Sequence, residues 1–162
     1  MSDHPPIHYP STLLATWFGC GLINPAPGTW GSLGAIPPAL LIFYLLGFWP
    51  FLMALFILTP IAFWATVAYE RDSDTHDAKQ IVIDEVIGQW IALLPVFFLI
   101  GFNWIYIAIA FALFRLFDIT KPWPISYFDK HIKGANGVML DDIVAGIFAA
   151  AIITGAYYAG LG

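Results

Sequence analysis

The chain has 162 residues, of which 60% are hydrophobic and only 10% are charged, and its net charge is −5. Soluble domains carry about 25% charged residues, so this composition excludes an ordinary soluble domain and indicates one membrane domain over residues 1–162. The acidic balance excludes a nucleic-acid partner, whose phosphates require a basic surface. The single cysteine, Cys20, excludes an intrachain disulfide.

The N-terminal third is apolar and is divided by glycine and proline. Residues 11–23 are too few to span a bilayer, which needs roughly 20, so we expect a short interfacial or re-entrant helix. We expect no cleaved signal peptide, because no Lys or Arg precedes this run. Residues 24–32, NPAPGTWGS, predict an ordered loop in which Ser32 is the N-cap of the next helix.

Five longer apolar segments predict membrane helices. They cover residues 33–46, 51–69, 80–102, 104–117 and 143–158. The charged run ERDSDTHDAK at 70–79 predicts a solvated loop. The expected fold class is therefore all-α, a polytopic helical membrane protein with about five membrane segments, one of which can be re-entrant, and a short N-terminal interfacial helix.

Five crossings place the N-terminal loop, residues 70–85 and residues 115–142 on one face of the membrane. All six Lys and Arg lie on that face. The positive-inside rule then makes it cytoplasmic. We expect Lys130 and Lys133 to attract anionic membrane lipids.

Two pairs of adjacent carboxylates open the third and fifth of these segments, Asp84 with Glu85 and Asp141 with Asp142. A glycine follows each pair at i+4, Gly88 after Asp84 and Gly146 after Asp142. Glycines at this spacing lie beneath the acids on the same helix face, where they permit close helix approach or leave room for a ligand. The acids can also simply cap helix dipoles, which is worth about 0.3–1 kcal/mol each.

A metal site accounts for the acids better than capping does. Two pairs together with Asp118 on one face would repel one another, and a bound divalent cation removes that repulsion. Hard carboxylate ligands suit Mg²⁺, which usually also binds water and a substrate phosphate. The predicted metal ligands are Asp84, Glu85, Asp141 and Asp142.

Basic and hydroxyl groups near the acids favour a phosphate substrate. We assign Arg115 and Lys121 to the phosphate, although Arg115 can also pair with Asp118 at i+3. The segment PGTWGS can offer backbone amides and hydroxyls to the same phosphate. Its predicted phosphate-binding residues are Gly28, Thr29, Gly31 and Ser32.

Other phosphatase chemistries find less support in the sequence. Cys20 has no arginine six residues later and lies in an apolar run, which favours a packing role. The run DSDT at 72–75 follows no buried strand, so it is not an aspartyl-phosphate site. His76 and His131 can shuttle protons, but for neither does the sequence spacing identify a catalytic partner.

Four segments in this order resemble bacterial phosphatidylglycerophosphatase A. They are GLINPAPGTWGSLGAIP, HDAKQIVIDEVIGQWI, FRLFDITKPWPISYFDK and GANGVMLDDIVAG, between residues 19 and 146. The resemblance implies Mg²⁺-dependent hydrolysis of phosphatidylglycerophosphate to phosphatidylglycerol and phosphate at the cytoplasmic side of the bacterial inner membrane. The motif acids that it implies as catalytic are Asp84, Glu85, Asp118, Asp141 and Asp142.

Two alternatives remain at this point. The same chemistry can act on another lipid phosphate, such as phosphatidate. A small cation or solute transporter is a different class, but its acids should lie in the middle of the segments rather than at helix starts on one face.

Overall fold

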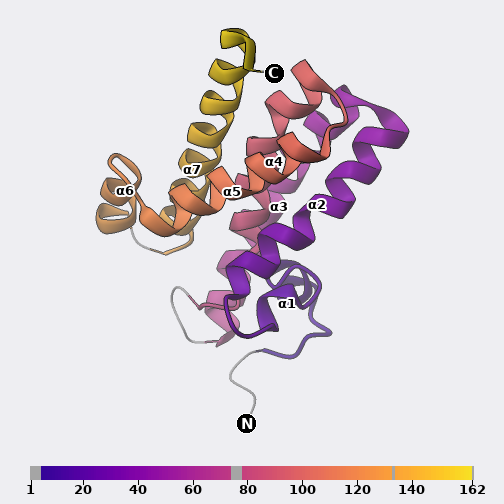
Figure 1. The fold of residues 1–162 in the computed structure, drawn as a ribbon. Coiled ribbons are helices and arrows are strands. Elements are labelled where there is room, and N and C mark those ends of the chain that lie inside the picture. The colour runs from indigo at the N-terminus through magenta and orange to yellow at the C-terminus, as the bar shows by residue number, and fades with distance from the viewer. Residues whose placement is uncertain (1–4, 74–77, 133, 162) are drawn as a thin grey trace.

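A computed structural model describes residues 5–73, 78–132 and 134–161, with the backbone alone at residues 128–130 and 161. All regular structure in these ranges is helical (Figure 1). In chain order the elements are α1 (Pro10–Ala15), η1 (Cys20–Leu22), α2 (Pro27–Leu46), α3 (Phe48–Ser73), α4 (Ile83–Pro95), η2 (Val96–Ile100), α5 (Trp104–Thr120), α6 (Ile125–His131), α7 (Ala135–Ala156) and η3 (Tyr157–Leu161). The predicted all-α class is confirmed.

Four helices are long and apolar enough to cross a membrane, so the chain is a polytopic membrane protein. These spans are Pro27–Leu46, Phe48–Ser73, Ile83–Ile100 and Ala135–Gly160. The remaining predicted segment belongs to α5, which has 17 residues and is therefore about 25 Å long. α5 runs obliquely from the end of η2 back toward the start of α7 (Figure 1).

α4 is the central helix. It packs against α2, α3, α5 and α7, most extensively against α7. Its indole at Trp90 donates to the carbonyl oxygen of Ala35 on α2 at 2.8 Å, and its side chains Ile87 and Leu93 are fully buried. A helix enclosed on several sides is expected to be apolar all round. The polar residues at its N-terminal end are therefore exceptions that need an explanation.

The segment PGTWGS is helical, so the predicted loop at residues 27–32 is wrong. α2 begins at Pro27, whose fixed φ and missing N–H are tolerated at the first helical position. Ser32 is consequently no N-cap: its hydroxyl donates to the carbonyl oxygen of Gly28 at 2.9 Å, one turn back.

α7 also begins earlier than predicted, at Ala135 rather than at residue 143. Asp141 and Asp142 therefore lie in its second turn, and its first turn contains no acid. The dipole explanation is wrong for this pair, because the effect fades within the first turn. Asp84 and Glu85, by contrast, do lie in the first turn of α4, as predicted.

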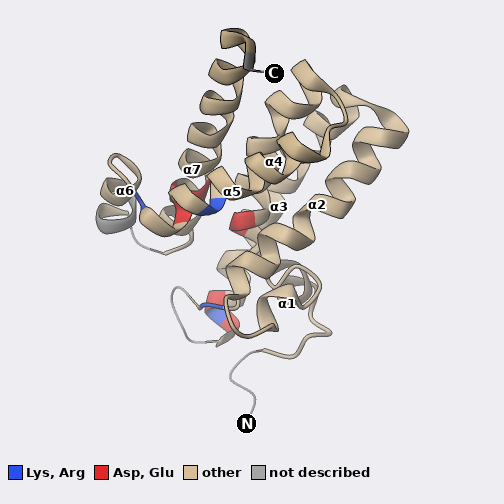
Figure 2. Cartoon of the chain, viewed as in Figure 1, with Lys and Arg blue, Asp and Glu red and all other residues tan. Residues whose placement is uncertain are grey.

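Charged segments differ from the prediction in two further places. α3 continues through the start of the charged run to Ser73, and residues 125–131 form α6, which was not expected. Residues 74–77 and Lys133 lie outside the described residues, and with them the predictions for His76 and for the second half of DSDT. The charged residues of the described ranges gather at one end of the helices (Figure 2).

Candidate active site

Three carboxylates from two helices, two of them buried and one half-buried, meet at this charged end. Asp84 and Glu85 come from α4 and Asp142 from α7, and each offers an oxygen within 4.8 Å of the other two. Asp84 and Asp142 are each only 4% exposed. Buried like charges at this separation are costly unless a cation compensates them.

Two glycines let these helices approach closely enough for the acids to meet. A Cβ on Gly88 of α4 would lie 2.7 Å from the carbonyl oxygen of Asp142. A Cβ on Gly146 of α7 would overlap the carbonyl of Gly88. Of the two roles predicted for these glycines, close helix approach is the one that the structure shows.

Arg115 of α5 joins three elements beside the acids. Its Nη1 lies 2.6 Å from Oδ2 of Asp118 and 4.0 Å from Oε1 of Glu85. The same nitrogen donates to the hydroxyl of Ser32 on α2 at 3.3 Å. The predicted ion pair between Arg115 and Asp118 is therefore present, and it extends to the carboxylate cluster.

Lys121 and Asp141 form a second ion pair. Nζ of Lys121 donates to Oδ2 of Asp141 at 2.6 Å. Lys121 ends α5 with a left-handed φ of 41°, a conformation that turns the chain away after the helix. Asp141 thus contacts a cation of the protein, whereas its neighbour Asp142 joins the cluster of Asp84 and Glu85.

The start of α2 closes the site from another side. Pro27 and Gly28 line the cavity, and a Cβ on Gly28 would overlap the carboxylate of Glu85 and lie 3.3 Å from Nη1 of Arg115. Thr29 is not among the cavity-lining residues, and Gly31 packs against Val82 instead. Of the four residues predicted to bind phosphate in this segment, only Gly28 reaches the cavity directly.

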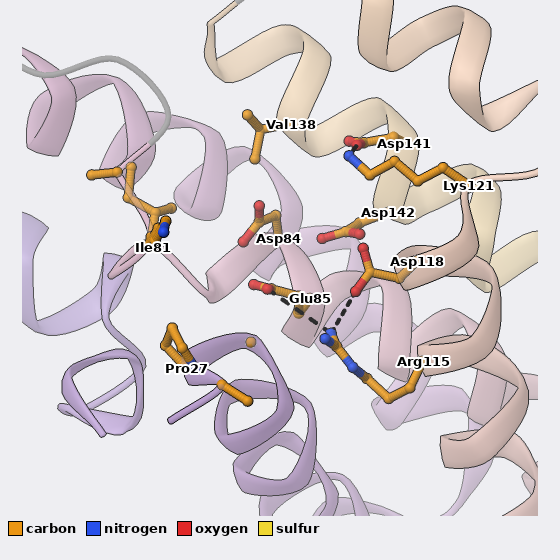
Figure 3. Close-up of a pocket in the computed structure, with 14 residues that line it drawn as sticks. Pro27, Ile81, Asp84, Glu85, Arg115, Asp118, Lys121, Val138, Asp141 and Asp142 are labelled. Atoms are coloured by element: carbon orange, nitrogen blue, oxygen red, sulfur yellow. Dashed lines mark hydrogen bonds and ion pairs between the residues drawn. The ribbon is translucent and has the colours of Figure 1, made fainter. Parts of the chain in front are cut away.

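These groups surround a cavity of about 340 Å³. Figure 3 shows Asp84, Glu85, Asp118 and Asp142 pointing toward one another, with Arg115 below them and the pair of Lys121 and Asp141 beside them. The whole lining comprises Ala26, Pro27, Gly28, Ala78, Lys79, Ile81, Asp84, Glu85, Arg115, Asp118, Lys121, Val138, Asp141 and Asp142. All five predicted catalytic acids therefore share one cavity with both predicted phosphate-binding cations.

The cluster fits a hard divalent cation. Oδ1 of Asp84 and Oε2 of Glu85 are buried and have no hydrogen-bond partner among the described residues. Buried oxygens without a partner are rare in native proteins and indicate a missing ligand. Three carboxylates from two helices are a suitable oxygen donor set for Mg²⁺, which binds few protein ligands.

A family model described as phosphatidylglycerophosphatase A matches residues 13–157, which include every residue of the cluster. The chain belongs to the phosphatidylglycerophosphatase A family. It is 42% identical to the phosphatidylglycerophosphatase A of Escherichia coli (strain K12) over 147 residues, 89% of this chain and 81% of that protein. It is 40% identical to the Haemophilus influenzae protein of the same name, over 94% of this chain and 90% of that protein.

A third relative has a different name. It is a Bacteroides thetaiotaomicron protein, named provisionally as a phosphatidylinositol-3-phosphatase, which is 37% identical over 87% of this chain and 89% of its own. No solved structure matches the chain. Membership of the phosphatidylglycerophosphatase A family makes this protein a lipid phosphatase, which overrules the transporter alternative.

Three residues outside the carboxylate cluster, Cys20, His131 and Lys79, differ in whether they reach the cavity. Cys20 is absent from the cavity lining, and burial raises the pKa of its thiol, as expected for a packing residue rather than a nucleophile. The ring Nδ1 of His131 lies 2.8 Å from the carbonyl oxygen of Tyr127 within α6. Lys79 does line the cavity, although it was not predicted, because its position in a charged run resembles that of an ordinary surface lysine.

Proposed function

We propose that the protein hydrolyses the terminal phosphomonoester of phosphatidylglycerophosphate to phosphatidylglycerol and phosphate, as a step of glycerophospholipid biosynthesis. The observation that carries this proposal is the cavity in which three carboxylates face Arg115 and Lys121. The names of the Escherichia coli and Haemophilus influenzae relatives supply the substrate.

Asp84, Glu85 and Asp142 would hold Mg²⁺, whereas Asp141 pairs with Lys121. A Mg²⁺ ion bound there supplies charge neutralisation for the phosphoryl oxygens and lowers the pKa of water. The nearby oxygens without a partner, on Asp84 and Glu85, favour this assignment.

Arg115 and Lys121 bind the phosphoryl group. Arg115 can donate to two phosphoryl oxygens through its planar guanidinium, while Asp118 and Ser32 hold it in place. Lys121 approaches from the side of α7, where Asp141 positions it. Cations held in advance stabilise charge in the transition state without reorganisation.

Hydrolysis transfers the phosphoryl group to water. The water oxygen forms a bond to phosphorus and the bond from phosphorus to the glycerol oxygen breaks. A carboxylate of the cluster accepts one proton of the water, and this carboxylic acid then gives the proton to the leaving glycerol oxygen, which becomes the hydroxyl of phosphatidylglycerol. The substrate's acyl chains remain in the bilayer alongside the apolar helices.

Charge also supports an orientation in the bacterial cytoplasmic membrane. All six Lys and Arg lie between positions 71 and 133, and the described ones are at the end of the bundle that carries the cavity. The positive-inside rule then turns the site toward the cytoplasm.

The deciding experiment is phosphate release by purified protein in mixed micelles of neutral detergent and phosphatidylglycerophosphate. We expect activity that EDTA abolishes and Mg²⁺ restores. Asp84→Asn should lower kcat by more than about 100-fold, since even outer-shell partners of a metal are worth about 10- to 100-fold. Asp72→Asn is the matched control, because Asp72 pairs with Arg71 at the end of α3, away from the cavity.

Two results would contradict the proposal. One is wild-type protein without activity on this lipid, and the other is full activity in Asp84→Asn. Phosphatidate and phosphatidylinositol 3-phosphate belong in the same substrate panel, because the name of the Bacteroides thetaiotaomicron relative gives a different substrate. A higher kcat/KM on either lipid than on phosphatidylglycerophosphate would identify that lipid as the preferred substrate.

A further inference from the structure

The cavity has a third cation, which lies in the segment HDAKQIVIDEVIGQWI but was assigned no role from the sequence. Lys79 lies in the connection between α3 and α4 and lines the cavity together with Ala78 and Ile81. Figure 3 shows Ile81 of this connection on one side of the acids and Lys121 on the other. Lys79 lies two residues before Ile81 in the same connection and lines the same cavity.

The three cations of the cavity differ in whether they already form an ion pair with a carboxylate of the protein. Arg115 is 2.6 Å from Asp118, and Lys121 is 2.6 Å from Asp141. Lys79 is exposed and makes no ion pair with any residue in the described ranges. It is therefore the cation of the cavity whose charge is fully available to a ligand.

The proposed substrate carries two phosphate groups. The terminal phosphomonoester is hydrolysed, and a phosphodiester, separated from it by the three carbons of glycerol, joins it to diacylglycerol. When the phosphomonoester lies against the carboxylate cluster and Arg115, the phosphodiester has to lie outside the cluster. A cation on the rim of the cavity is suited to that second charge, whereas the cluster itself would repel it.

We infer that Lys79 binds the phosphodiester of the substrate and so selects lipids that carry a phosphodiester in addition to the terminal phosphomonoester. This inference rests on the proposed function. It assigns a binding role that is separate from catalysis, because the phosphodiester is unchanged in the reaction. Phosphatidate has a phosphomonoester alone and gains nothing from Lys79.

The first test compares two substrates in mixed micelles of neutral detergent, which removes the anionic surface that attracts any lysine. Lys79→Ala should lower kcat/KM for phosphatidylglycerophosphate about tenfold, mainly through KM, as expected for a lost charge-assisted hydrogen bond. It should leave kcat/KM for phosphatidate within twofold of wild type. Lys79→Arg should recover most of the loss.

Arg71→Ala is the matched control. Arg71 is an exposed cation at the end of α3, it pairs with Asp72, and it does not line the cavity. Its loss removes the same charge from the same face and should change neither substrate's kcat/KM by more than twofold. Equal losses in Lys79→Ala and Arg71→Ala would assign the effect to general surface charge and overturn the inference.

The second test is independent of catalysis. Short-chain phosphatidylglycerol retains the phosphodiester and lacks the phosphomonoester, so its binding includes the Lys79 contact and excludes every contact of the phosphomonoester. We expect it to raise the Tm of wild-type protein in neutral detergent, and to do so at about tenfold higher concentration in Lys79→Ala. Equal titrations of the two proteins would overturn the inference even if phosphatidylglycerophosphate is the substrate. If Lys79→Ala shifts the titration but wild-type protein does not hydrolyse phosphatidylglycerophosphate, the proposed function would be overturned instead.

Discussion

Gly88 and Gly146 are in direct backbone contact where α4 crosses α7, because a Cβ on Gly146 would overlap the carbonyl of Gly88. Each glycine follows an acid of the cluster by four residues, Gly88 after Asp84 and Gly146 after Asp142. Residues at i and i+4 lie on the same helix face. The crossing therefore holds the two carboxylates side by side one turn nearer the charged end.

Gly146→Ala should separate the two helices. Overpacking of this kind costs about 1–3 kcal/mol, and the wider spacing should pull Asp142 away from Asp84. We expect a lower Tm in detergent, a raised Mg²⁺ requirement and a loss of kcat. Gly155→Ala is the control on the same helix, because a Cβ there meets no atom within 4 Å. Wild-type kcat in Gly146→Ala would show that the crossing does not position the acids.

Gly28→Ala tests the contact between α2 and the cluster. Its new methyl group would overlap the carboxylate of Glu85 and crowd Arg115, so we expect kcat to fall by about 10- to 100-fold, as for other groups that orient metal ligands. Thr29→Ala should have a smaller effect, since Thr29 does not line the cavity. If the loss in Thr29→Ala were the larger one, the hydroxyl predicted to bind phosphate would be the important group.

Asp141 and Asp142 are neighbours with different expected roles. Asp142→Asn removes a member of the three-carboxylate cluster, and it should abolish both activity and the rise of Tm on Mg²⁺ addition. Asp141→Asn frees Lys121 from its ion pair but leaves the cluster intact. We expect it to keep the Mg²⁺-dependent rise of Tm and to change KM more than kcat. Loss of that rise in Asp141→Asn would make Asp141 a metal ligand, as the sequence predicted.

Gln89 lies one turn below Glu85 on α4 and is fully buried. Neither of its amide atoms has a hydrogen-bond partner among the residues described. A buried amide without a partner costs about 1–3 kcal/mol, so Gln89→Met should raise the free energy of unfolding by about 1 kcal/mol and keep activity. Gln89→Glu, of the same shape, should destabilise because it buries a further charge. A less stable Gln89→Met variant would indicate a bound water that satisfies the amide.

Several features could be predicted from the sequence because they depend on neighbours along the chain. Apolar runs long enough for a bilayer predicted the membrane helices. The positions of Asp84 and Glu85 in a first helical turn, and the spacing of Arg115 and Asp118 at i+3, are also local properties. The helix boundaries were less accurate, since Pro27 and Ala135 begin helices within stretches that read as loops.

Only the tertiary structure decided which groups meet across helices. The sequence treated Asp141 and Asp142 alike, yet one pairs with Lys121 and the other joins Asp84 and Glu85. It assigned four residues of the α2 start to phosphate, and the packing of α2 on α4 leaves only Gly28 of these four at the cavity. Lys79 lies in one of the family segments, but nothing in the sequence showed that it lines the cavity, because contacts between distant segments depend on the angles and distances at which helices cross.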